Sequence, residues 1–277
     1  MFGLTNLKIY DIINNMKLYK NKNHDTKHFS MLSILFALQV LLGVVPAILF
    51  MVYVLHVQNT LALPGEDFEA YSLALMHAIL FISVIFLSFT GYTILVRKYN
   101  ILISGERGER ALLKIAKKLK GNQHVFMNLP IRYKNNRSEI DLLVVSERGI
   151  ISVEVKNHSG AVMGSGDDDF FIHRKFYRKG KITETEMKNP FKQVKRQREI
   201  LKNILRSNGI NVWIDSVIFF SGNPTLKLDV SPNIKVATSE NEMFTLINEY
   251  ITPEGKERLT TENLGEVVKI LRGLNNN

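Results

Sequence analysis

Two long apolar runs constrain this chain more than any other feature of its sequence. They cover residues 32–55 and 73–96, each is 24 residues long, and neither contains an Asp, Glu, Lys or Arg. A helix of about 20 apolar residues crosses the hydrocarbon core of a bilayer, so either run can span it with some tilt. The alternative is a pair of buried core helices, which seldom extend this far without a charged face. The sequence therefore predicts two transmembrane helices.

The residues that flank the two runs predict their orientation. Five lysines precede the first run, and Arg97 and Lys98 directly follow the second. The connecting segment 56–72 has no lysine or arginine and contains three acidic residues. Because basic flanks stay on the cytoplasmic side, we expect a multi-pass protein of the inner (cytoplasmic) membrane with both termini in the cytoplasm. The first run follows a long polar tail, unlike a cleaved signal peptide, so we expect it to remain as an anchor.

The basic segment 1–28 has apolar residues at close to helical spacing, with lysines between them. Two interpretations stay open at this point. The segment could form a short interfacial helix on an anionic leaflet, or it could be a loosely ordered tail.

Residues 97–277 have the composition of a globular domain that is large enough for one buried core. A helix is expected over 105–121, and a hairpin of strands 140–145 and 150–156, with Gly149 at a turn position that favours positive φ. Asn189 and Pro190 mark the start of a helix that reaches about residue 206. The later pattern predicts further strands around 161–163, 212–222 and 234–238, and helices that begin after Ser239 and near Leu264. This order predicts a mixed α/β domain.

Composition limits the kind of chemistry that the chain can perform. There is no cysteine, which excludes disulfide frameworks and zinc sites with cysteine ligands. The formal net charge is +10 and the isoelectric point is near 9.6. Such a charge favours a polyanionic partner, either nucleic acid or an anionic lipid surface.

Acidic residues interrupt the predicted hairpin where a plain sheet would not need them. Asp141 lies in the first strand, and Glu154 and Lys156 close the second. Because residues two apart on a strand share a face, Glu154 and Lys156 point the same way, next to a strand that carries an aspartate. Two carboxylates can bind Mg²⁺, and a lysine beside them can orient a water or stabilise a charged phosphorus centre. The alternative is an exposed cross-strand ion pair with little energetic value.

Three motifs together resemble a known family. They are GERGER at 105–110, SEIDLLVVSERGIISVEVKNHSG at 138–160 and NPFKQ at 189–193. In this order they resemble the nuclease-related domain, NERD, a branch of the PD-(D/E)xK nuclease superfamily. The resemblance covers roughly residues 101–222, and residues 223–277 resemble the tail that often follows this domain. It implies a restriction-endonuclease-like α/β core, with a mixed central sheet flanked by helices, here preceded by the two-helix transmembrane hairpin.

The resemblance also implies roles for individual residues. Asp141 and Glu154 match the two metal carboxylates, with Mg²⁺ or Mn²⁺ as the ion, and Lys156 matches the catalytic lysine. Glu109 matches a helix glutamate that helps to hold the metal or its water, and Gln193 matches a glutamine that packs near the site and contacts substrate. The alternatives are a solvated carboxylate for Glu109 and a surface amide for Gln193.

One segment departs from the family pattern. Family members often have a tryptophan after the third strand, where this chain has DDDFFIHRKF, and its one tryptophan is Trp213. Phe170 or Phe171 is expected to replace that tryptophan in packing. The acidic run 167–169 could be a metal cluster, but three acids at a glycine-flanked tip favour a solvated turn.

Basic residues gather on the predicted helix from Pro190 and in the aromatic segment before it. They can neutralise phosphates without reading sequence, and the alternative is a solvated or membrane-facing patch. The candidate nucleic-acid contacts are Lys192, Lys195, Arg196, Arg174 and Lys175.

The sequence thus predicts a membrane-anchored, metal-dependent nuclease that acts on DNA, in defence against incoming DNA or in its processing. The rival interpretation is an inactive, tethered nucleic-acid-binding or scaffold protein. We expect a cytoplasmic tail (1–28), a transmembrane hairpin (29–98), a NERD domain (99–222) and a C-terminal α/β extension packed on it (223–277). Expected partners are DNA and the lipid bilayer, and the oligomeric state, including a homo-oligomer, stays open.

Overall fold

The computed structural model describes residues 10–13, 16–20, 22–61, 68–229, 233–251 and 258–276. The chain divides into two compact units. The smaller comprises residues 26–103, and the larger combines residues 1–25 with 104–277. Helix α2 (Phe68–Ala116) continues from the smaller unit into the larger one.

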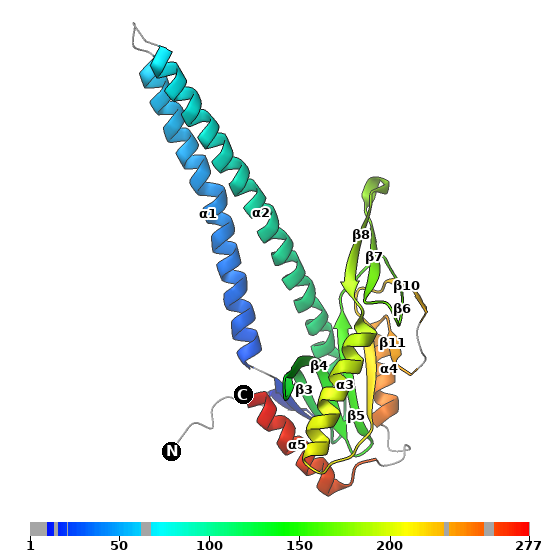
Figure 1. Ribbon diagram of the computed structural model, residues 1–277. Helices are drawn as coiled ribbons and strands as arrows, with labels where there is room; N and C mark the ends of the chain where they lie inside the picture. Colours follow the sequence, from blue (N-terminus) through cyan, green and yellow to red (C-terminus); the bar gives the residue numbers. More distant parts are fainter. Residues whose placement is uncertain are drawn as a thin grey trace, which may run out of the picture. The chain divides into compact units, whose positions relative to one another are not determined.

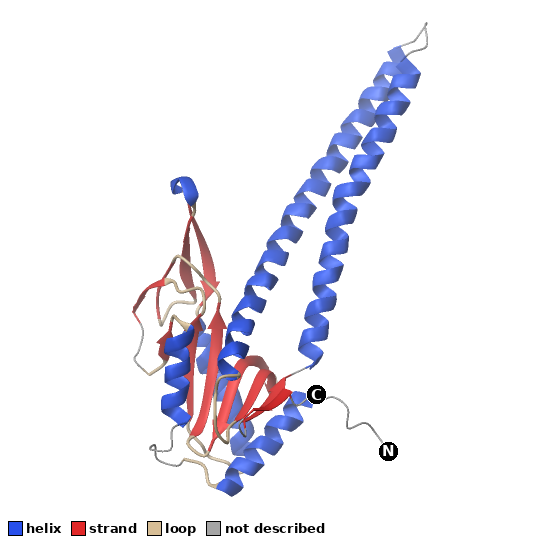
Figure 2. Ribbon diagram, turned by 180° about the vertical axis from the view of Figure 1, so that it is seen from behind, coloured by secondary structure: helices blue, strands red, loops and turns tan. Residues whose placement is uncertain are grey.

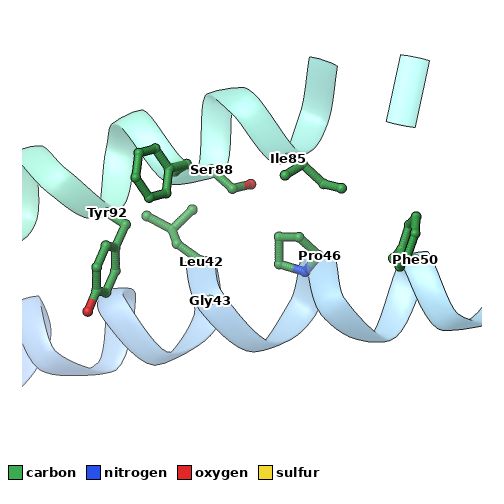
Figure 3. Close-up of a pocket in the computed structure, with 8 residues that line it drawn as sticks. Leu42, Gly43, Pro46, Phe50, Ile85, Ser88 and Tyr92 are labelled. Atoms are coloured by element: carbon green, nitrogen blue, oxygen red, sulfur yellow. The ribbon is translucent and has the colours of Figure 1, made fainter. Parts of the chain in front are cut away.

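The smaller unit is a pair of long helices (Figure 1), α1 (Lys22–Leu61) and most of α2. Both are long and apolar enough to cross a membrane, over Ser33–Tyr53 and from Leu75 onward. Many of their large apolar side chains are exposed, among them Phe86 at 67% and Leu87 at 69%. A buried core helix would show the opposite. An apolar groove of about 470 Å³ lies between the helices (Figure 3), lined by Leu42, Pro46, Phe50, Ile85 and Tyr92 among others.

The larger unit is built around a mixed seven-stranded sheet (Figure 2) in the order β1-β2-β3-β4-β5-β9-β11. The strands β3, β4 and β5 are antiparallel neighbours, whereas β9 and β11 continue the sheet in parallel with β5. Their bounds are β1 (Tyr10–Ile13), β2 (Met16–Lys20), β3 (His124–Tyr133), β4 (Asn136–Ser146), β5 (Gly149–Lys156), β9 (Ile214–Phe220) and β11 (Lys235–Ala237).

A second sheet of four strands has the order β10-β6-β7-β8. Its strands are β6 (Ala161–Ser165), β7 (Phe170–Phe176), β8 (Ile182–Lys188) and β10 (Thr225–Asp229). A short 3-10 helix, η1 (Arg178–Gly180), connects β7 to β8. These two strands form a hairpin that projects beyond the rest of the larger unit (Figures 1 and 2).

Helices cover both faces of the large sheet and make three layers. Apolar residues of α3 (Pro190–Ser207) and α5 (Thr261–Asn276) share one core cluster with β3 and β4. The end of α2 and helix α4 (Glu240–Ile251) share a second cluster with β5 and β9. Leu112 and Ile115, which lie in the predicted helix 105–121, are at most 1% exposed. The mixed α/β fold with a sheet flanked by helices is therefore confirmed.

Local signals in the sequence mark several element boundaries correctly. Strands β4 and β5 form the predicted hairpin, and Gly149 has a φ of 128°, which an L side chain would strain to adopt. The Asn189 side chain accepts the backbone N–H groups of Phe191 and Lys192 and so caps α3 at its expected start. Ser239 likewise accepts the Glu242 N–H at the start of α4.

The N-terminal segment differs from both interpretations of its sequence. Residues 10–13 and 16–20 form strands, and β2 pairs in parallel with β3. Leu18 and Tyr19 are at most 2% exposed, so the segment contributes to the core of the larger unit. An unpaired edge of β3 would leave backbone groups without partners, and β2 satisfies them. The rest of the proposed interfacial helix, residues 1–9, lies outside the described residues.

Tyr19 connects this added strand to β3 and to α5. Its ring stacks on Phe126 at 4.7 Å and on His124 at 6.0 Å, and its hydroxyl accepts a hydrogen bond from Arg272. Burial, together with the smaller effects of the charges of Lys17 and Arg272, lowers the pKa of His124 to about 4. The folded protein therefore keeps His124 neutral.

This predicts an acid sensitivity of the fold. Between pH 6.5 and 4 the unfolded chain binds a proton at His124 that the folded protein does not bind, so the stability falls as the pH is lowered. In denaturant unfolding of the full chain in detergent, His124→Gln is expected to reduce the proton uptake on unfolding near pH 5 by up to one proton. At pH 8 both proteins have a neutral side chain, which gives the baseline. Equal pH slopes in the two proteins would contradict this account.

Candidate active site

The centre of the candidate site is the carboxyl end of β5. This strand is buried over its first six residues, Gly149 to Glu154. Glu154 is 2% exposed, and its Oε1 lies 2.5 Å from Lys156 Nζ. An isolated buried carboxylate would be costly, so its ion pair with Lys156 is required by its position.

Asp141 on the neighbouring strand β4 joins this pair. Its Oδ2 accepts the backbone N–H of Val155 at 2.7 Å, which places Asp141 beside the segment that carries Glu154 and Lys156. Burial raises the pKa of Asp141 well above its ordinary range, and the nearby Glu154 carboxylate raises it further. Glu109 adds a smaller effect in the same direction, while the Val155 N–H and Lys156 oppose it. The site therefore gathers carboxyl groups, and Lys156 offsets their charge.

Helix α3 places two amide side chains over the pair. Gln193 Oε1 accepts a hydrogen bond from Lys156 Nζ at 3.0 Å. Gln197 is fully buried, and its Nε2 donates to Glu154 Oε2 and to the Glu139 carbonyl, at 2.7 Å each. Its Oε1 is buried and has no hydrogen-bond partner among the described residues. The helix thereby fixes both charged groups of β5.

Helix α2 approaches the opposite side of β5. A side chain added at Gly108 would come within 3.1 Å of Val155, so glycine permits the helix to pack closely on the strand. The next residue, Glu109, accepts a hydrogen bond from Asn128 Nδ2 at 2.9 Å. Its effect on the pKa of Asp141 shows that its charge acts on the same site.

Asn157 connects the helix, the strand end and β9. Its Nδ2 donates to the Ser104 carbonyl at 3.0 Å, and its Oδ1 accepts from Ser221 Oγ at 3.3 Å. The hydroxyl of Ser104 in turn donates to the Asn157 carbonyl at 3.0 Å. These bonds hold the segment of α2 that begins at Ser104 next to the end of β5, where Lys156 lies.

The structure brings together four of the five predicted catalytic residues, with Glu109 connected to them only through its charge, and the roles of all five stay predictions. Asp141, Glu154, Lys156 and Gln193 are linked by hydrogen bonds or by direct charge effects, and Glu109 acts on Asp141. In the described part of the chain, no three His, Asp or Glu side chains gather closely enough to hold a metal ion by themselves. Two carboxylates and neutral oxygens are what the site offers.

The predicted nucleic-acid contacts occupy two elements. On α3, Lys192 pairs with Asp169 at 2.7 Å, Lys195 is exposed, and Arg196 reaches the Arg137 carbonyl at 3.4 Å. On β7, Arg174 forms a 2.5 Å ion pair with Glu184, which reduces the charge that it can offer to phosphate, and Lys175 is exposed.

The segment that departs from the family pattern is a turn. Asp168 accepts the Ser165 N–H at 2.7 Å, and Asn189 donates to three carbonyls of the same loop. Phe171 is fully buried and packs 5.9 Å from Phe191, whereas Phe170 is 50% exposed. Phe171 thus fills the interior, and the three aspartates belong to a turn.

Gln197 and Asn157 also belong to the site, although the sequence pattern did not predict them there. Gln197 follows Gln193 by four positions, and on a helix that spacing places both on one face, so the spacing could have identified it. Asn157 stands inside the quoted strand motif, but its partners are 53 and 64 residues away. No local signal identifies those contacts.

Removal of the Gln197 amide predicts a measurable loss of stability. Gln197→Met keeps the length of the side chain but removes the donor to the buried Glu154 carboxylate, at an expected cost of about 1–3 kcal/mol. Denaturant unfolding of the full chain in detergent measures this cost. Lys195→Met, on the exposed face of the same helix, is the matched control and should change stability by less than about 0.5 kcal/mol. Equal losses in both variants would contradict the assignment.

Comparison with known proteins agrees with this geometry. Residues 104–221 match the family model of NERD, the nuclease-related domain. No curated protein and no solved structure gave a match. The matched range begins at Ser104, the first residue of α2 that belongs to the larger unit. It ends at Ser221, which directly follows β9 and donates a hydrogen bond to Asn157. This chain therefore carries a nuclease-related domain of the NERD family over residues 104–221.

Proposed function

We propose that this protein is a membrane-anchored nuclease that hydrolyses phosphodiester bonds of DNA with the help of a divalent metal ion. One observation supports the proposal above all others. Asp141, Glu154 and Lys156 converge at the end of a central strand inside a nuclease-related domain, with the carboxylates close enough for one to raise the pKa of the other. A module that only binds nucleic acid would gain nothing from two such carboxylates at its centre.

The residues fit a hard divalent cation such as Mg²⁺ or Mn²⁺. A bound cation would relieve the mutual repulsion of Asp141 and Glu154, and both residues offer the oxygen ligands that such ions prefer. Asp141 and Glu154 would hold the ion, with Glu109 acting on the site from α2. When bound, the ion supplies Lewis-acid chemistry, by which it lowers the pKa of water and polarises a phosphoryl oxygen.

Lys156 is the residue proposed to act on the reacting groups. Its ammonium is held between Glu154 Oε1 and Gln193 Oε1, so its position is fixed before substrate binds. A fixed cation stabilises the charge that develops on a phosphoryl group in the transition state, and it can orient the attacking water. Gln197 acts through Glu154, as a positioning residue.

Helix α3 is proposed to carry the contacts to the DNA backbone. It begins beside the site and displays Lys192, Lys195 and Arg196 on its exposed side, where they can neutralise phosphates without reading bases. Substrate recognition of this kind suits a nuclease that acts on DNA of many sequences.

The two apolar helices are proposed to anchor the protein in the cytoplasmic membrane. Their basic flanks support a topology with both termini and the nuclease-related domain in the cytoplasm and the acidic segment 56–72 outside. A nuclease held there would meet DNA as it enters the cell. Defence against foreign DNA, or the processing of DNA during uptake, follows from that location.

Cleavage by the full chain in detergent or nanodiscs tests the proposal. With Mg²⁺ or Mn²⁺ we expect cutting of circular or linear DNA that EDTA abolishes. Lys156→Met is expected to lower the rate about 10²–10⁴-fold because it removes a positioned catalytic group. Asp141→Asn should abolish metal-dependent cutting, whereas Asp167→Asn, in the turn, should not. Tight DNA binding without cutting in the wild type would identify the inactive binder instead.

The contribution of α3 can be measured separately from chemistry. In EDTA, the logarithm of DNA affinity should fall linearly with the logarithm of salt concentration, and each lost phosphate contact should reduce the slope by about 0.9. Lys195→Gln and Arg196→Gln are each expected to show this change. Lys269→Gln, on the exposed side of α5, is the control and should leave the slope as it is. Unchanged slopes in all three variants would place the DNA contacts elsewhere.

A further inference from the structure

Most of the large apolar side chains that the larger unit exposes belong to one hairpin. Between residues 104 and 277, six such side chains in the described part of the chain are exposed, each by at least 42%. One is Trp213, and the other five belong to the β7–β8 hairpin: Phe170, Ile172, Phe176, Tyr177 and Ile182. A concentration of this kind marks a surface that meets a partner.

The strand register gathers four of these side chains on one face. Phe176 lies directly opposite Ile182, and alternation along β7 puts Phe170 and Ile172 on the same side as Phe176. The other side of β7 carries Phe171, which belongs to the core. Alternate residues of β7 therefore face the core on one side and form the exposed apolar face on the other.

The tip of the hairpin is basic. Residues 175–182 contain no acidic residue, and Lys175, Arg178 and Lys181 are exposed beside Phe176 and Tyr177. A backbone hydrogen bond of 2.9 Å from Tyr177 to Lys181 closes the tip. Farther down, the ion pair of Arg174 with Glu184 leaves that level of the hairpin neutral.

Two polyanions could accept such a tip, and the side chains favour lipid. Proteins that bind single-stranded nucleic acid combine cations with aromatic rings on which the bases stack. Two of the five exposed side chains here are isoleucines, which have no ring to stack. An anionic membrane interface accepts aliphatic and aromatic side chains alike, and it attracts lysine and arginine around them.

The covalent connection keeps the larger unit tethered near a bilayer. Only seven residues, 97–103, separate the second apolar run from Ser104, where the larger unit begins. These residues belong to α2, and even fully extended they would reach no more than about 25 Å. Tethering makes the docking of the tip an intramolecular event, so a weak affinity for lipid is sufficient.

We propose that the tip of the β7–β8 hairpin docks into the headgroup region of the anionic membrane that anchors the chain. Phe176, Tyr177 and Ile182 enter the interface, and Lys175, Arg178 and Lys181 bind lipid phosphates. The proposal rests on the proposed anchoring of the protein, and it is independent of the nuclease activity.

The absence of cysteine from the sequence allows a direct test. Tyr177→Cys in the full chain is labelled with an environment-sensitive fluorophore and reconstituted into liposomes of phosphatidylcholine with or without phosphatidylglycerol. Spin-labelled lipids then report contact by quenching. Asn263→Cys, on the exposed side of α5, is the control in the same unit, and Phe86→Cys reports insertion of the second apolar run.

In anionic liposomes the labels at positions 177 and 86 should be quenched, and the label at 263 should not. Each of Lys175→Gln, Arg178→Gln and Lys181→Gln is expected to weaken docking about fivefold at low salt. No quenching at 177 with quenching at 86 would overturn the proposal. So would a label at 177 that responds to single-stranded DNA instead of lipid. No quenching at 86 would refute the anchoring and this proposal with it, while DNA cleavage in the same vesicles reports the nuclease function separately.

Discussion

The ion pair of Glu154 with Lys156 is the interaction on which the rest of the site depends. A carboxylate that is 2% exposed on a central strand is tolerated only when its charge is paired and its oxygens accept hydrogen bonds. Lys156 pairs with the charge of Glu154, and Gln197 donates a hydrogen bond to its other oxygen. Because Gln197 belongs to α3, the requirement extends from β5 to the helix, and it explains why a glutamine lies in a helix face that is otherwise apolar.

The charges of the site also depend on the close approach of α2 to β5. Glu109 acts on Asp141 only if the helix lies against β5, and Gly108 removes the side chain that would keep them apart. Asn157 then holds the start of this helical segment through Ser104. The close packing of α2 on β5 thereby brings the charge of Glu109 near Asp141. Close packing and hydrogen bonds of this kind fix the geometry of the site in the folded chain, and such pre-organisation is what the proposed catalysis by charge requires.

Features that depend on neighbouring residues could be predicted from the sequence, and features that depend on distant ones could not. The β4–β5 hairpin follows from alternation and from one glycine, and the start of α3 follows from Asn189 and Pro190. The clustering of Asp141 with Glu154 was expected because the two strands are consecutive, and the resemblance to NERD added Glu109 and Gln193. Strand β2 was missed since its apolar residues gain their partner, β3, across more than 100 residues of chain. Lys17 and Tyr19 are compatible with a helix, and only the open edge of β3 decides against it.

The strong positive charge of this chain admits two polyanionic partners, and the two proposals assign them to different places in the fold. On α3 the cations stand beside a carboxylate site with few large apolar neighbours, an arrangement that suits phosphates of a polymer held by charge alone. At the hairpin tip the cations surround exposed phenylalanine, tyrosine and isoleucine, which water disfavours and a lipid interface accepts. Salt weakens the first kind of contact directly because counterion release drives it. The second kind retains its apolar part, so the two proposals together predict that rising ionic strength releases nucleic acid from the domain before it releases the domain from lipid.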